Sequence, residues 1–535
     1  MGFFFLFYIF TNAGWYKVGD EFFMVKVARQ LVTKGQIGFE LTQPPKDPYS
    51  EDYIAKGPDG RYYTKWGLGQ SLVEIPFVFL HRLTTSVHLP TPIEGGLPGA
   101  AYHSEWIFLI LCPSLISAIG CVLLCGLSRR LGYSERVSVF LSLVYGLGTM
   151  VWPYSKSLMS EGTLNVAVLG GVYGAVSYAA GNRKGWLTLS GACLGFAAIT
   201  KLTALILVPI VGIYLLASRG FRNSWRDIGL FFLPPLVLFL GIEGWHNTIR
   251  NGTIWPSGYD RGWGALGFAT PLYVGLWGLL ASPGKSFFLY APACLLGLVS
   301  ARGFFRRNRK EALLFFGSAM AYTFSHALWC LWAGDWAWGP RFLLVITPYL
   351  ILPAGVFLES WRMKSRLTKA VTIGLLAFSL WIQILGVSIH PFAFIQARAG
   401  VVNQLIDLSP MVFTYAGAYC EDTFNQFSPR FSHVAGNWWL FKHMLFSYDL
   451  WSDAPWRALG DFNLDQPIWV SGNRTIPFWW PVALPLVVPS SKAWVYPLLL
   501  LNLLLLTLSA MKVASRLKGP RAAVDSLHGE ENLAP

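Results

Sequence analysis

The sequence predicts an all-α polytopic membrane protein with about 12 transmembrane helices and with interfacial helices on its outer face. Of its 535 residues, 54% are hydrophobic and only 13% are charged, and the mean hydropathy is +0.45. A soluble protein of this size would need far more charge to cover its surface. Apolar runs of about 20 residues, the length of a helix that crosses a bilayer, recur along the chain. Basic residues gather in short clusters between these runs.

The basic clusters orient the chain in the membrane. Short loops rich in Lys and Arg stay in the cytoplasm, so all of these clusters should lie on that side. The formal net charge of +14 therefore indicates membrane topology, and we expect no nucleic-acid partner. The clusters are Arg129, Arg130 and Arg136; Arg183 and Lys184; Arg219, Arg222 and Arg226; Arg302, Arg306, Arg307, Arg309 and Lys310; Arg362, Lys364, Arg366 and Lys369; and Lys512, Arg516, Lys518 and Arg521.

This orientation determines the order of the elements. If the apolar run 67–83 crossed the membrane, the basic residues at 129–136 would lie on the outer side. We therefore predict an interfacial helix there. The segments 17–105 and 390–491 then lie on the outer side. Both are too long to be simple connections, so we expect the function on the outer face. With the basic clusters inside and both termini cytoplasmic, the predicted spans lie near residues 2–16, 106–128, 137–153, 162–180, 186–199, 202–217, 228–247, 286–302, 313–332, 341–359, 369–389 and 492–512.

The first predicted span is short. It falls below the usual length of roughly 17 to 25 residues, and no basic residue precedes it to hold its start inside. The true start of the protein can therefore lie upstream of Met1. A cleaved secretory signal is the alternative interpretation, but the charged n-region and the small-residue cleavage pattern that define such a signal are missing.

Several kinds of chemistry are excluded by the motifs and the cysteines. No CxxC, HExxH, P-loop or GxGxxG motif occurs in a context that would give it meaning, so nucleotide-driven chemistry is not expected. All cysteines except Cys420 fall inside predicted spans, where a cysteine behaves as a small apolar residue. A disulfide framework is therefore excluded.

Two acids open the first long outer segment. Asp20 and Glu21 begin the stretch 20–39, in which apolar residues recur at a helical period until Gly35. We predict an amphipathic helix on the outer surface, with both acids in its first turn. Acids in that position either favour the positive end of the helix dipole or take part in chemistry at the membrane surface.

The order of several short motifs is similar to that of a known enzyme family. The acidic pair is followed by YYTKWGLG at 62–69, YSKSLMSE at 154–161, TKLT at 200–203 and GPRF at 339–342. This order resembles the GT-C membrane glycosyltransferases, in the branch of the protein O-mannosyltransferases and the lipid A aminoarabinose transferase. The resemblance covers roughly residues 1–390 and suggests a GT-C-like transmembrane catalytic module there, which includes the outer loop 17–105. Beyond it, the sequence pattern predicts a Trp-rich outer loop or small domain at 391–491, a last transmembrane helix at 492–512 and a cytoplasmic tail at 513–535.

The resemblance implies that a sugar moves from a polyprenyl-phosphate carrier to an acceptor on the outer face, with inversion. Such a transfer needs a base for the incoming hydroxyl and positive charge on the departing phosphate. Asp20 matches the first-loop acid that acts as the base in this family, and Glu21 and Glu161 are the other candidate catalytic acids. Glu161 can orient the acceptor, bind a metal or hold Lys201, and the alternative to these roles is a charge that faces water at the rim of the bundle.

The candidate phosphate ligands are cations near the outer ends of apolar runs. A lipid phosphate at the membrane interface requires such cations, and Lys65, Lys201 and Arg341 are so placed. Each has a structural alternative. Arg341 can be an interfacial anchor among Trp residues, Lys201 can pair with a carboxylate, and Lys65 can be a solvated loop residue.

Candidates for acceptor binding are weaker. Glu243 lies inside a predicted span, where an acid should be paired or protonated, and Asp335 lies in a Trp-rich turn. The Trp residues of the last outer segment can stack on sugars, form an interfacial belt or pack in a small core. They are Trp438, Trp439, Trp451, Trp456, Trp469, Trp479 and Trp480, of which we take Trp438 and Trp439 as candidates.

A metal site is not predicted from the sequence. Asp20, Glu161 and Asp335 would suit a divalent cation if they converged, but oxygen ligands scattered along a sequence have no diagnostic spacing. No cofactor is required by the sequence, and metal dependence stays open.

The expected partners are a polyprenyl-phosphate-linked sugar donor, a glycan, lipid or protein acceptor, and membrane lipids. The protein should be an integral membrane protein with its active site on the extracytoplasmic face, in the plasma (inner) membrane if its source is bacterial. Two alternative functions are a transporter or flippase of lipid-linked sugars and a non-catalytic family member that binds them. The predicted number of spans suits a transporter, but the sequence contains no internal repeat of the kind that many transporters carry.

Overall fold

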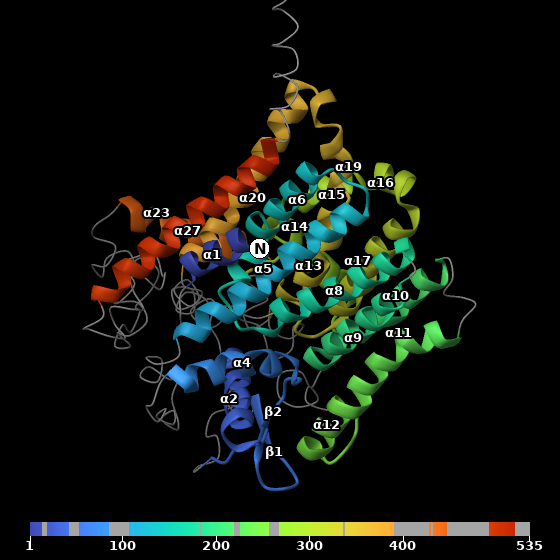
Figure 1. The fold of residues 1–535 in the computed structure, drawn as a ribbon, viewed down its shortest axis with the longest axis vertical. Helices are drawn as coiled ribbons and strands as arrows, with labels where there is room; N and C mark the ends of the chain where they lie inside the picture. Colours follow the sequence, from blue (N-terminus) through green and yellow to red (C-terminus); the bar gives the residue numbers. More distant parts are fainter. Residues whose placement is uncertain are drawn as a thin grey trace, which may run out of the picture.

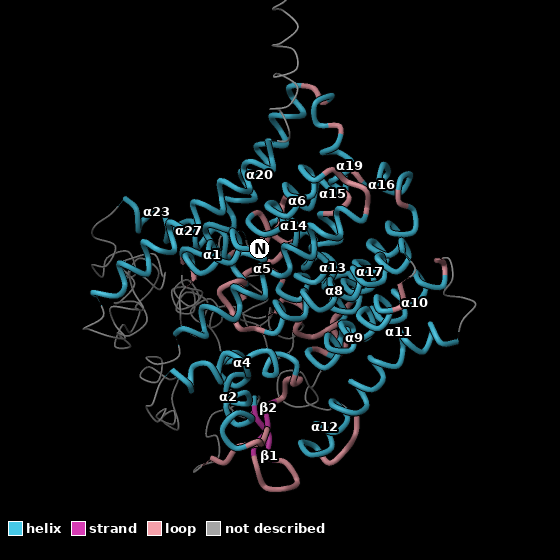
Figure 2. Tube along the Cα trace, in the orientation of Figure 1, coloured by secondary structure: helices cyan, strands magenta, loops and turns pink. Residues whose placement is uncertain are grey.

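The computed structural model describes residues 1–12, 19–41, 53–84, 106–181, 183–218, 225–255, 267–334, 337–389, 427, 429, 432–446 and 492–518. The described part consists mainly of helices, together with one two-stranded antiparallel sheet (Figures 1 and 2). Most helices form a bundle, and the sheet lies with α2 and α4 at one end of it (Figure 1).

The elements follow one another along the chain in three groups. The first outer segment and its flanks contain α1 (Gly2–Thr11), α2 (Gly19–Lys34), β1 (Ile54–Lys56), β2 (Tyr62–Thr64) and α4 (Gly69–Thr84). Next come α5 (Trp106–Arg130), α6 (Glu135–Leu147), α7 (Val151–Tyr154), α8 (Ser160–Gly181), α9 (Gly185–Thr200), η2 (Leu202–Ile206), α10 (Leu207–Leu216), α11 (Trp225–Val237), the π-helical η4 (Leu238–Glu243) and α12 (Gly244–Asn251). The remainder contains α13 (Leu272–Ala281), α14 (Phe287–Tyr290), α15 (Cys294–Val299), α16 (Ala301–Arg307), α17 (Arg309–Leu328), η6 (Arg341–Ile346), α18 (Thr347–Ile351), α19 (Ala354–Glu359), η7 (Trp361–Met363), α20 (Arg366–Ser388), α23 (His433–Phe446) and α27 (Lys492–Lys518).

The described helices identify an integral membrane protein. Six helical stretches in the described part are long and apolar enough to cross a bilayer, namely Ile110–Arg130, Ser160–Gly181, Trp225–Asn251, Arg341–Glu359, Arg366–Ser388 and Tyr496–Leu517. Shorter apolar helices occupy Gly2–Thr11, Gly185–Thr200, Leu202–Leu216 and Leu272–Ala281. The larger total of spans expected from the sequence stays a prediction.

The structure differs from the predicted element order in three places. The predicted span 137–153 is divided into α6 and α7, which separate at Gly148. The predicted span 286–302 is broken into α14, α15 and the start of α16, because Pro292 lies between the first two and has no N–H to continue a helix. Helix α13 has no predicted counterpart, since its 10 residues are too few to be recognised as a span.

The described residues of the predicted outer segment 17–105 include the helix that the pattern of residues 20–39 predicts. Helix α2 ends at Lys34, and Gly35 follows with a φ of 65°, the left-handed conformation that glycine adopts most easily. Helix α4 covers the stretch predicted as an interfacial helix and packs on α2, where the Ser71 hydroxyl donates to the carbonyl of Met24 at 2.8 Å. Strands β1 and β2, which lie between these two helices in the sequence, form an antiparallel pair.

Helices α8 and α9 pack closely as an antiparallel pair. A Cβ added at Gly171 would lie 2.7 Å from Cγ of Leu194, and one at Gly174 would lie 2.9 Å from the carbonyl oxygen of Trp186. Small residues allow membrane helices to approach each other in this way. As a result, the first residues of α8 lie beside the end of α9.

The loops that carry the described members of the basic clusters lie near one another, and their position on the cytoplasmic side stays a prediction. In the described part, contacts join these loops, which lie with α16 and α19 at the end of the bundle opposite the sheet (Figure 1). The contacts are Arg307 Nη2 to the Gly132 carbonyl (2.6 Å), Lys310 Nζ to the Ala217 carbonyl (2.6 Å), Ser134 N to Glu359 Oε1 (2.6 Å), Arg516 Nη1 to Glu135 Oε1 (3.3 Å) and Lys184 Nζ to Asp227 Oδ1 (2.9 Å).

This arrangement yields a topology prediction. Single cysteines introduced as Pro58→Cys and Met363→Cys, in a Cys420→Ser background, lie in exposed loops at opposite ends of the bundle. A membrane-impermeant maleimide added to intact cells should modify the first and spare the second, because the basic loops stay inside. Both should react after permeabilisation. Modification of the Met363→Cys variant in intact cells would reverse the orientation.

Candidate active site

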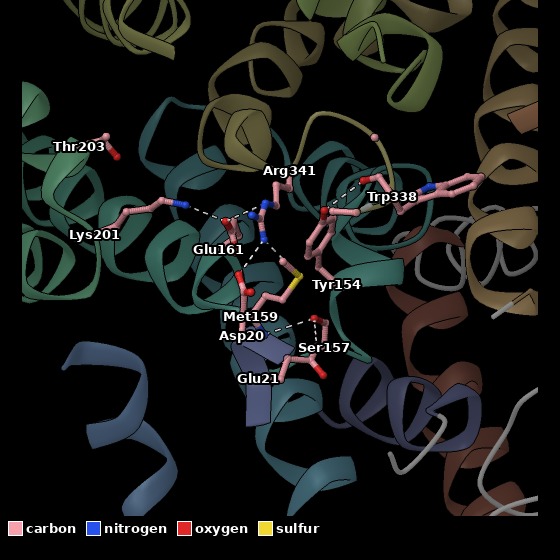
Figure 3. Close-up of polar contacts among 12 residues, drawn as sticks. Asp20, Glu21, Tyr154, Ser157, Met159, Glu161, Lys201, Thr203, Trp338 and Arg341 are labelled. Carbon is pink, nitrogen blue, oxygen red and sulfur yellow. Dashed lines mark hydrogen bonds and ion pairs between the residues drawn. The ribbon is translucent and has the colours of Figure 1, made fainter. Parts of the chain in front are cut away.

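Four charged side chains from separate parts of the chain meet near the start of α2 (Figure 3). Arg341 Nη1 lies 3.2 Å from Asp20 Oδ2, and Arg341 Nε lies 3.7 Å from Glu161 Oε1. The same oxygen of Glu161 accepts a hydrogen bond from Lys201 Nζ at 2.8 Å. The charges therefore alternate in the order Asp20, Arg341, Glu161, Lys201. We call these four residues the charge network, and all four are among the site residues that the sequence predicts.

Glu161 is the centre of the charge network. It is the second residue of α8, so its carboxylate lies at the helix end where a negative charge is favoured. The side chain is buried, and its two cationic neighbours supply the compensation that a buried carboxylate requires. The close packing of α8 on α9 brings it within reach of Lys201, which follows the end of α9 directly.

Lys201 occupies an extended residue between α9 and η2, with φ −154° and ψ 121°. The segment 67–69 packs against the turn before it. A Cβ at Gly67 would lie 2.3 Å from the carbonyl oxygen of Ile199, and one at Gly69 would lie 2.0 Å from Thr200 Oγ1. Only glycine permits this approach, so the YYTKWGLG motif packs directly against the backbone that precedes Lys201.

Arg341 is presented by a loop that two buried side chains hold in place. Lys285 Nζ donates to the carbonyl of Ala337 at 2.7 Å and to that of Gly339 at 3.2 Å. The Tyr154 hydroxyl donates to the carbonyl of Trp338 at 3.1 Å (Figure 3). Sequence reasoning missed Lys285, whose signal is a single lysine just before a predicted apolar span. It selected the motif that contains Tyr154 without assigning a role to that residue.

Asp20 and Glu21 are neighbours in sequence with different surroundings. Asp20 faces Arg341, whereas the buried Glu21 carboxylate accepts hydrogen bonds from the Ser157 hydroxyl and from the backbone N–H of Leu158, the latter at 3.1 Å. Successive residues of a helix point about 100° apart, which explains the difference. Glu21 therefore attaches the start of α2 to the segment that precedes α8.

The charge network is partly accessible. The exposed fractions of the side chains are 16% for Asp20, 14% for Lys201, 11% for Arg341 and 2% for Glu161. Two carboxylates and two cations leave the network with no formal net charge. A phosphate could reach both cations and a hydroxyl could reach Asp20, while Glu161 stays covered.

Lys65 lies beside this site and is held differently. Its ammonium lies 5.1 Å from the centroid of the Tyr53 ring and 5.5 Å from that of the Trp66 ring, within the range of cation–π contacts. The Tyr53 ring in turn lies close to Gly19, where an added Cβ would be 3.2 Å from Tyr53 Cε2. Lys65 thus lies against the rings of Tyr53 and Trp66, and the Tyr53 ring lies close to the residue that precedes Asp20.

Of the predicted acceptor residues, the structure describes the side chains of Glu243 and Trp438, and both have partners outside the charge network. Within the described part, Glu243 pairs with His246 at 3.7 Å and with Arg250 at 3.9 Å. Trp438 lies on α23 and packs edge to face on Trp381, with ring centroids 5.1 Å apart. The side chains of Asp335 and Trp439, and the other Trp residues of the last outer segment, lie outside the described residues.

The described residues contain no group of three or more His, Cys, Asp or Glu side chains that could hold a metal ion. Asp20 and Glu161 both face Arg341, and Asp335 lies outside the described residues. Metal dependence therefore stays open.

The comparison with protein families confirms the resemblance that the motifs predict. Residues 103–243, about a quarter of the chain, match the model of the family described as dolichyl-phosphate-mannose-protein mannosyltransferase. The matched stretch contains Glu161 and Lys201 but not Asp20 or Arg341. No curated protein matches the chain.

Solved structures of two membrane proteins are similar to the chain. ArnT from Cupriavidus metallidurans aligns at 16% identity over 81% of this chain, both bound to undecaprenyl phosphate (TM-score 0.44, 75% of that chain) and in the apo state (0.45, 74%). The archaeal oligosaccharyltransferase AglB from Archaeoglobus fulgidus, in complex with an inhibitory peptide and a dolichol-phosphate, aligns at 12% identity over 77% of this chain and 56% of its own, with a TM-score of 0.40. Scores this low do not establish a common fold.

The first prediction from the site concerns its stability. Glu161→Gln removes a buried negative charge between two cations, and breaking a buried ion pair costs about 3–5 kcal/mol of unfolding free energy. Because Lys201 and Arg341 keep some exposure, we expect the lower part of that range. The free energy of unfolding in detergent micelles measures the effect.

A matched control is Glu135→Gln. Glu135 pairs with Arg129 and Arg516 at an exposed position, so its loss should cost no more than about 1 kcal/mol. Equal effects of the two variants would mean that the charge network does not stabilise the fold.

Proposed function

We propose that this protein is an inverting membrane glycosyltransferase, which moves a sugar from a polyprenyl-phosphate carrier to an acceptor on the outer face of the membrane. The observation that carries the proposal is the charge network, which combines a carboxylate with two phosphate-binding cations at a partly accessible position. The family matched over residues 103–243 is named for a polyprenyl-phosphate sugar donor, which supports the same substrate class.

Arg341 and Lys201 are the proposed ligands of the donor phosphate. Arg341 begins the candidate span Arg341–Glu359, and Lys201 precedes the apolar stretch Leu202–Leu216. A phosphate at the membrane interface can meet cations at such positions while its polyprenyl tail stays in the lipid. The planar guanidinium of Arg341 suits two oxygens of a phosphate, and the ammonium of Lys201 adds a point charge. Lys65, in the adjoining loop, is the proposed third cation.

Asp20 is the proposed base. It removes the proton of the acceptor hydroxyl as that oxygen attacks the anomeric carbon of the donor. The bond between this carbon and the phosphate oxygen breaks, and its electron pair stays with the phosphate, whose charge Arg341 and Lys201 balance. Attack in line with the departing phosphate inverts the anomeric centre.

The contact between Asp20 and Arg341 suggests how donor binding prepares the base. Arg341 Nη1 lies 3.2 Å from Asp20 Oδ2, so the guanidinium occupies one side of this carboxylate. A donor phosphate would compete for the guanidinium and release Asp20. The acceptor would then be deprotonated only when a donor is present.

Glu161 and Glu21 have supporting roles in this proposal. Glu161 holds Lys201 and Arg341 at the spacing that a phosphate needs, and its burial keeps it from the substrate. Glu21 fixes the start of α2 and therefore the direction of Asp20. Neither residue needs to touch the reacting atoms.

A transfer assay tests the proposed function against its alternatives. Purified protein in lipid nanodiscs, given a polyprenyl-phosphate sugar and a set of envelope glycans, lipids and proteins, should form a glycosidic bond without ATP. Reconstituted vesicles measure transport in parallel. Movement of intact lipid-linked sugar across the bilayer with no new bond would indicate a transporter or flippase. Binding without either reaction would indicate a non-catalytic protein.

The second prediction from the site concerns Asp20. Asp20→Asn preserves the shape of the side chain and removes the base, so the transfer rate should fall about 10²- to 10⁴-fold. The affinity for the donor should not fall, because the variant removes the carboxylate that competes with the donor phosphate for Arg341. Single-turnover rates and direct donor binding measure the two quantities separately.

A matched control is Asp227→Asn. Asp227 is a paired carboxylate like Asp20, but it is buried, its partner is Lys184, and it lies with the basic loops at the other end of the bundle. This variant should retain most of the transfer rate. If Asp20→Asn kept more than about a tenth of the wild-type rate, Asp20 would only stabilise the helix start.

The third prediction distinguishes Arg341 from Asp20. Arg341→Ala should weaken donor binding and also slow the transfer, because a group bound to the phosphate acts in both the ground state and the transition state. Arg341→Lys keeps the charge and should recover part of the donor affinity. Unchanged donor binding in Arg341→Ala would assign this residue to structure alone.

A further inference from the structure

A second buried polar cluster lies on one face of α12 and at the end of η4. Its members are Glu243, His246, Asn247 and Arg250, which are separated by three, four and seven residues and therefore share one side of a helix. The charge network does not include them. Figure 1 places α12 beside the sheet, at the end of the bundle that carries α2.

Arg250 contacts the loop that carries Lys65. Its Nη1 atom donates to the carbonyls of Thr64 at 3.0 Å, of Lys65 at 2.9 Å and of Trp66 at 3.4 Å. Three successive carbonyls can point to one nitrogen only if the chain curves around it. Hydrogen bonds from a charged donor are stronger than neutral ones, so the guanidinium determines the path of residues 64–66.

The guanidinium is itself held from the side of α12. Its Nη2 atom donates to the side-chain oxygen of Asn247 and lies 3.9 Å from Glu243 Oε1. Arg250 is buried, and the negative charge of Glu243 balances its positive charge. The contacts on both sides leave the guanidinium little freedom to turn.

The fixed backbone of this loop determines where the Lys65 ammonium lies. The backbone N–H of Lys65 donates to the carbonyl of Tyr53 at 3.1 Å, while its own carbonyl accepts from Arg250. With both sides of the peptide backbone fixed, the side chain leaves the loop over the rings of Tyr53 and Trp66. The Tyr53 ring lies against Gly19, the residue before Asp20.

We infer that Arg250 is a positioning residue, which fixes the Lys65 loop so that the ammonium of Lys65 meets the phosphate of a polyprenyl-phosphate donor. The inference rests on the proposed function and extends it to a residue outside the charge network. Arg250 acts through the backbone of residues 64–66 and does not touch the donor. Glu243, which the sequence offers as a candidate for acceptor binding, is the partner of Arg250 in this arrangement.

Two measurements on the full-length protein in nanodiscs test this inference. The first is hydrogen exchange of the segment 62–69, which reports the loop without any donor. The second is binding of undecaprenyl phosphate, measured by native mass spectrometry. The variants are Arg250→Gln, Arg250→Lys, Lys65→Gln and the double variant. Arg307→Gln is the matched control, because Arg307 also donates to a backbone carbonyl but lies with the basic loops.

The hydrogen-exchange measurement tests whether Arg250 holds the segment 62–69 in place. Arg250→Gln should increase exchange in segment 62–69, and Arg307→Gln should leave that segment unchanged. Arg250→Lys, which keeps a positive charge, should retain more protection than Arg250→Gln. Unchanged exchange in Arg250→Gln would overturn the inference whether or not the protein binds the lipid.

The binding arm distinguishes positioning from general stabilisation. Arg250→Gln should weaken lipid binding at least about fivefold, and it should add little in the Lys65→Gln background, because residues that act through one another are not additive. Additive losses, or wild-type affinity in Arg250→Gln, would overturn the inference. Failure of the wild-type protein to bind undecaprenyl phosphate would instead count against the proposed function.

Discussion

The carboxylate of Glu161, shared by Lys201 and Arg341, is the interaction on which the rest of the site depends. A buried acid with one cation is already costly to desolvate, and two cations without the acid would repel each other. The side chains come from α8, from the end of α9 and from the start of η6. Their meeting therefore requires the close packing of α8 on α9, which the small residues Gly171 and Gly174 permit.

The surrounding loops keep the other charged groups near this carboxylate. Lys285 and Tyr154 hold the loop before Arg341, and Glu21 attaches the start of α2 to the segment before α8. The resulting network is formally neutral in the absence of substrate. An added phosphate would have to compete with Asp20 for Arg341, which links donor binding to the release of the proposed base.

Much of the fold and of the site could be predicted because the signals are local. Hydropathy and the basic loops indicate a membrane bundle, and the helical period before Gly35 predicts the end of α2. Asp20 and Glu161 could be singled out through the motifs that resemble a known family, and Lys201 and Arg341 also because a charge beside an apolar run needs a partner. A contact between Glu161 and Lys201 was one of the expected options, whereas the pairing of Asp20 with Arg341 could not be predicted, because it joins positions 321 residues apart.

Features without a local signal were missed. Helix α13 is too short to be recognised as a span, and the break at Pro292 divides a run that is apolar throughout. Arg250 and Lys285 are single cations whose partners are backbone carbonyls of distant loops. The attachment of Glu21 to the segment before α8 could not be predicted either, because it depends on which neighbour this side chain faces in the folded chain.

The most direct test of the central claim is an experimental structure of the full-length protein in nanodiscs with undecaprenyl phosphate bound. If the charge network is the donor site, the phosphate should contact Arg341 and Lys201, and Arg341 Nη1 should lie farther from Asp20 Oδ2 than the 3.2 Å described above. A phosphate bound elsewhere, with Asp20, Arg341, Glu161 and Lys201 still paired as described above, would contradict the account.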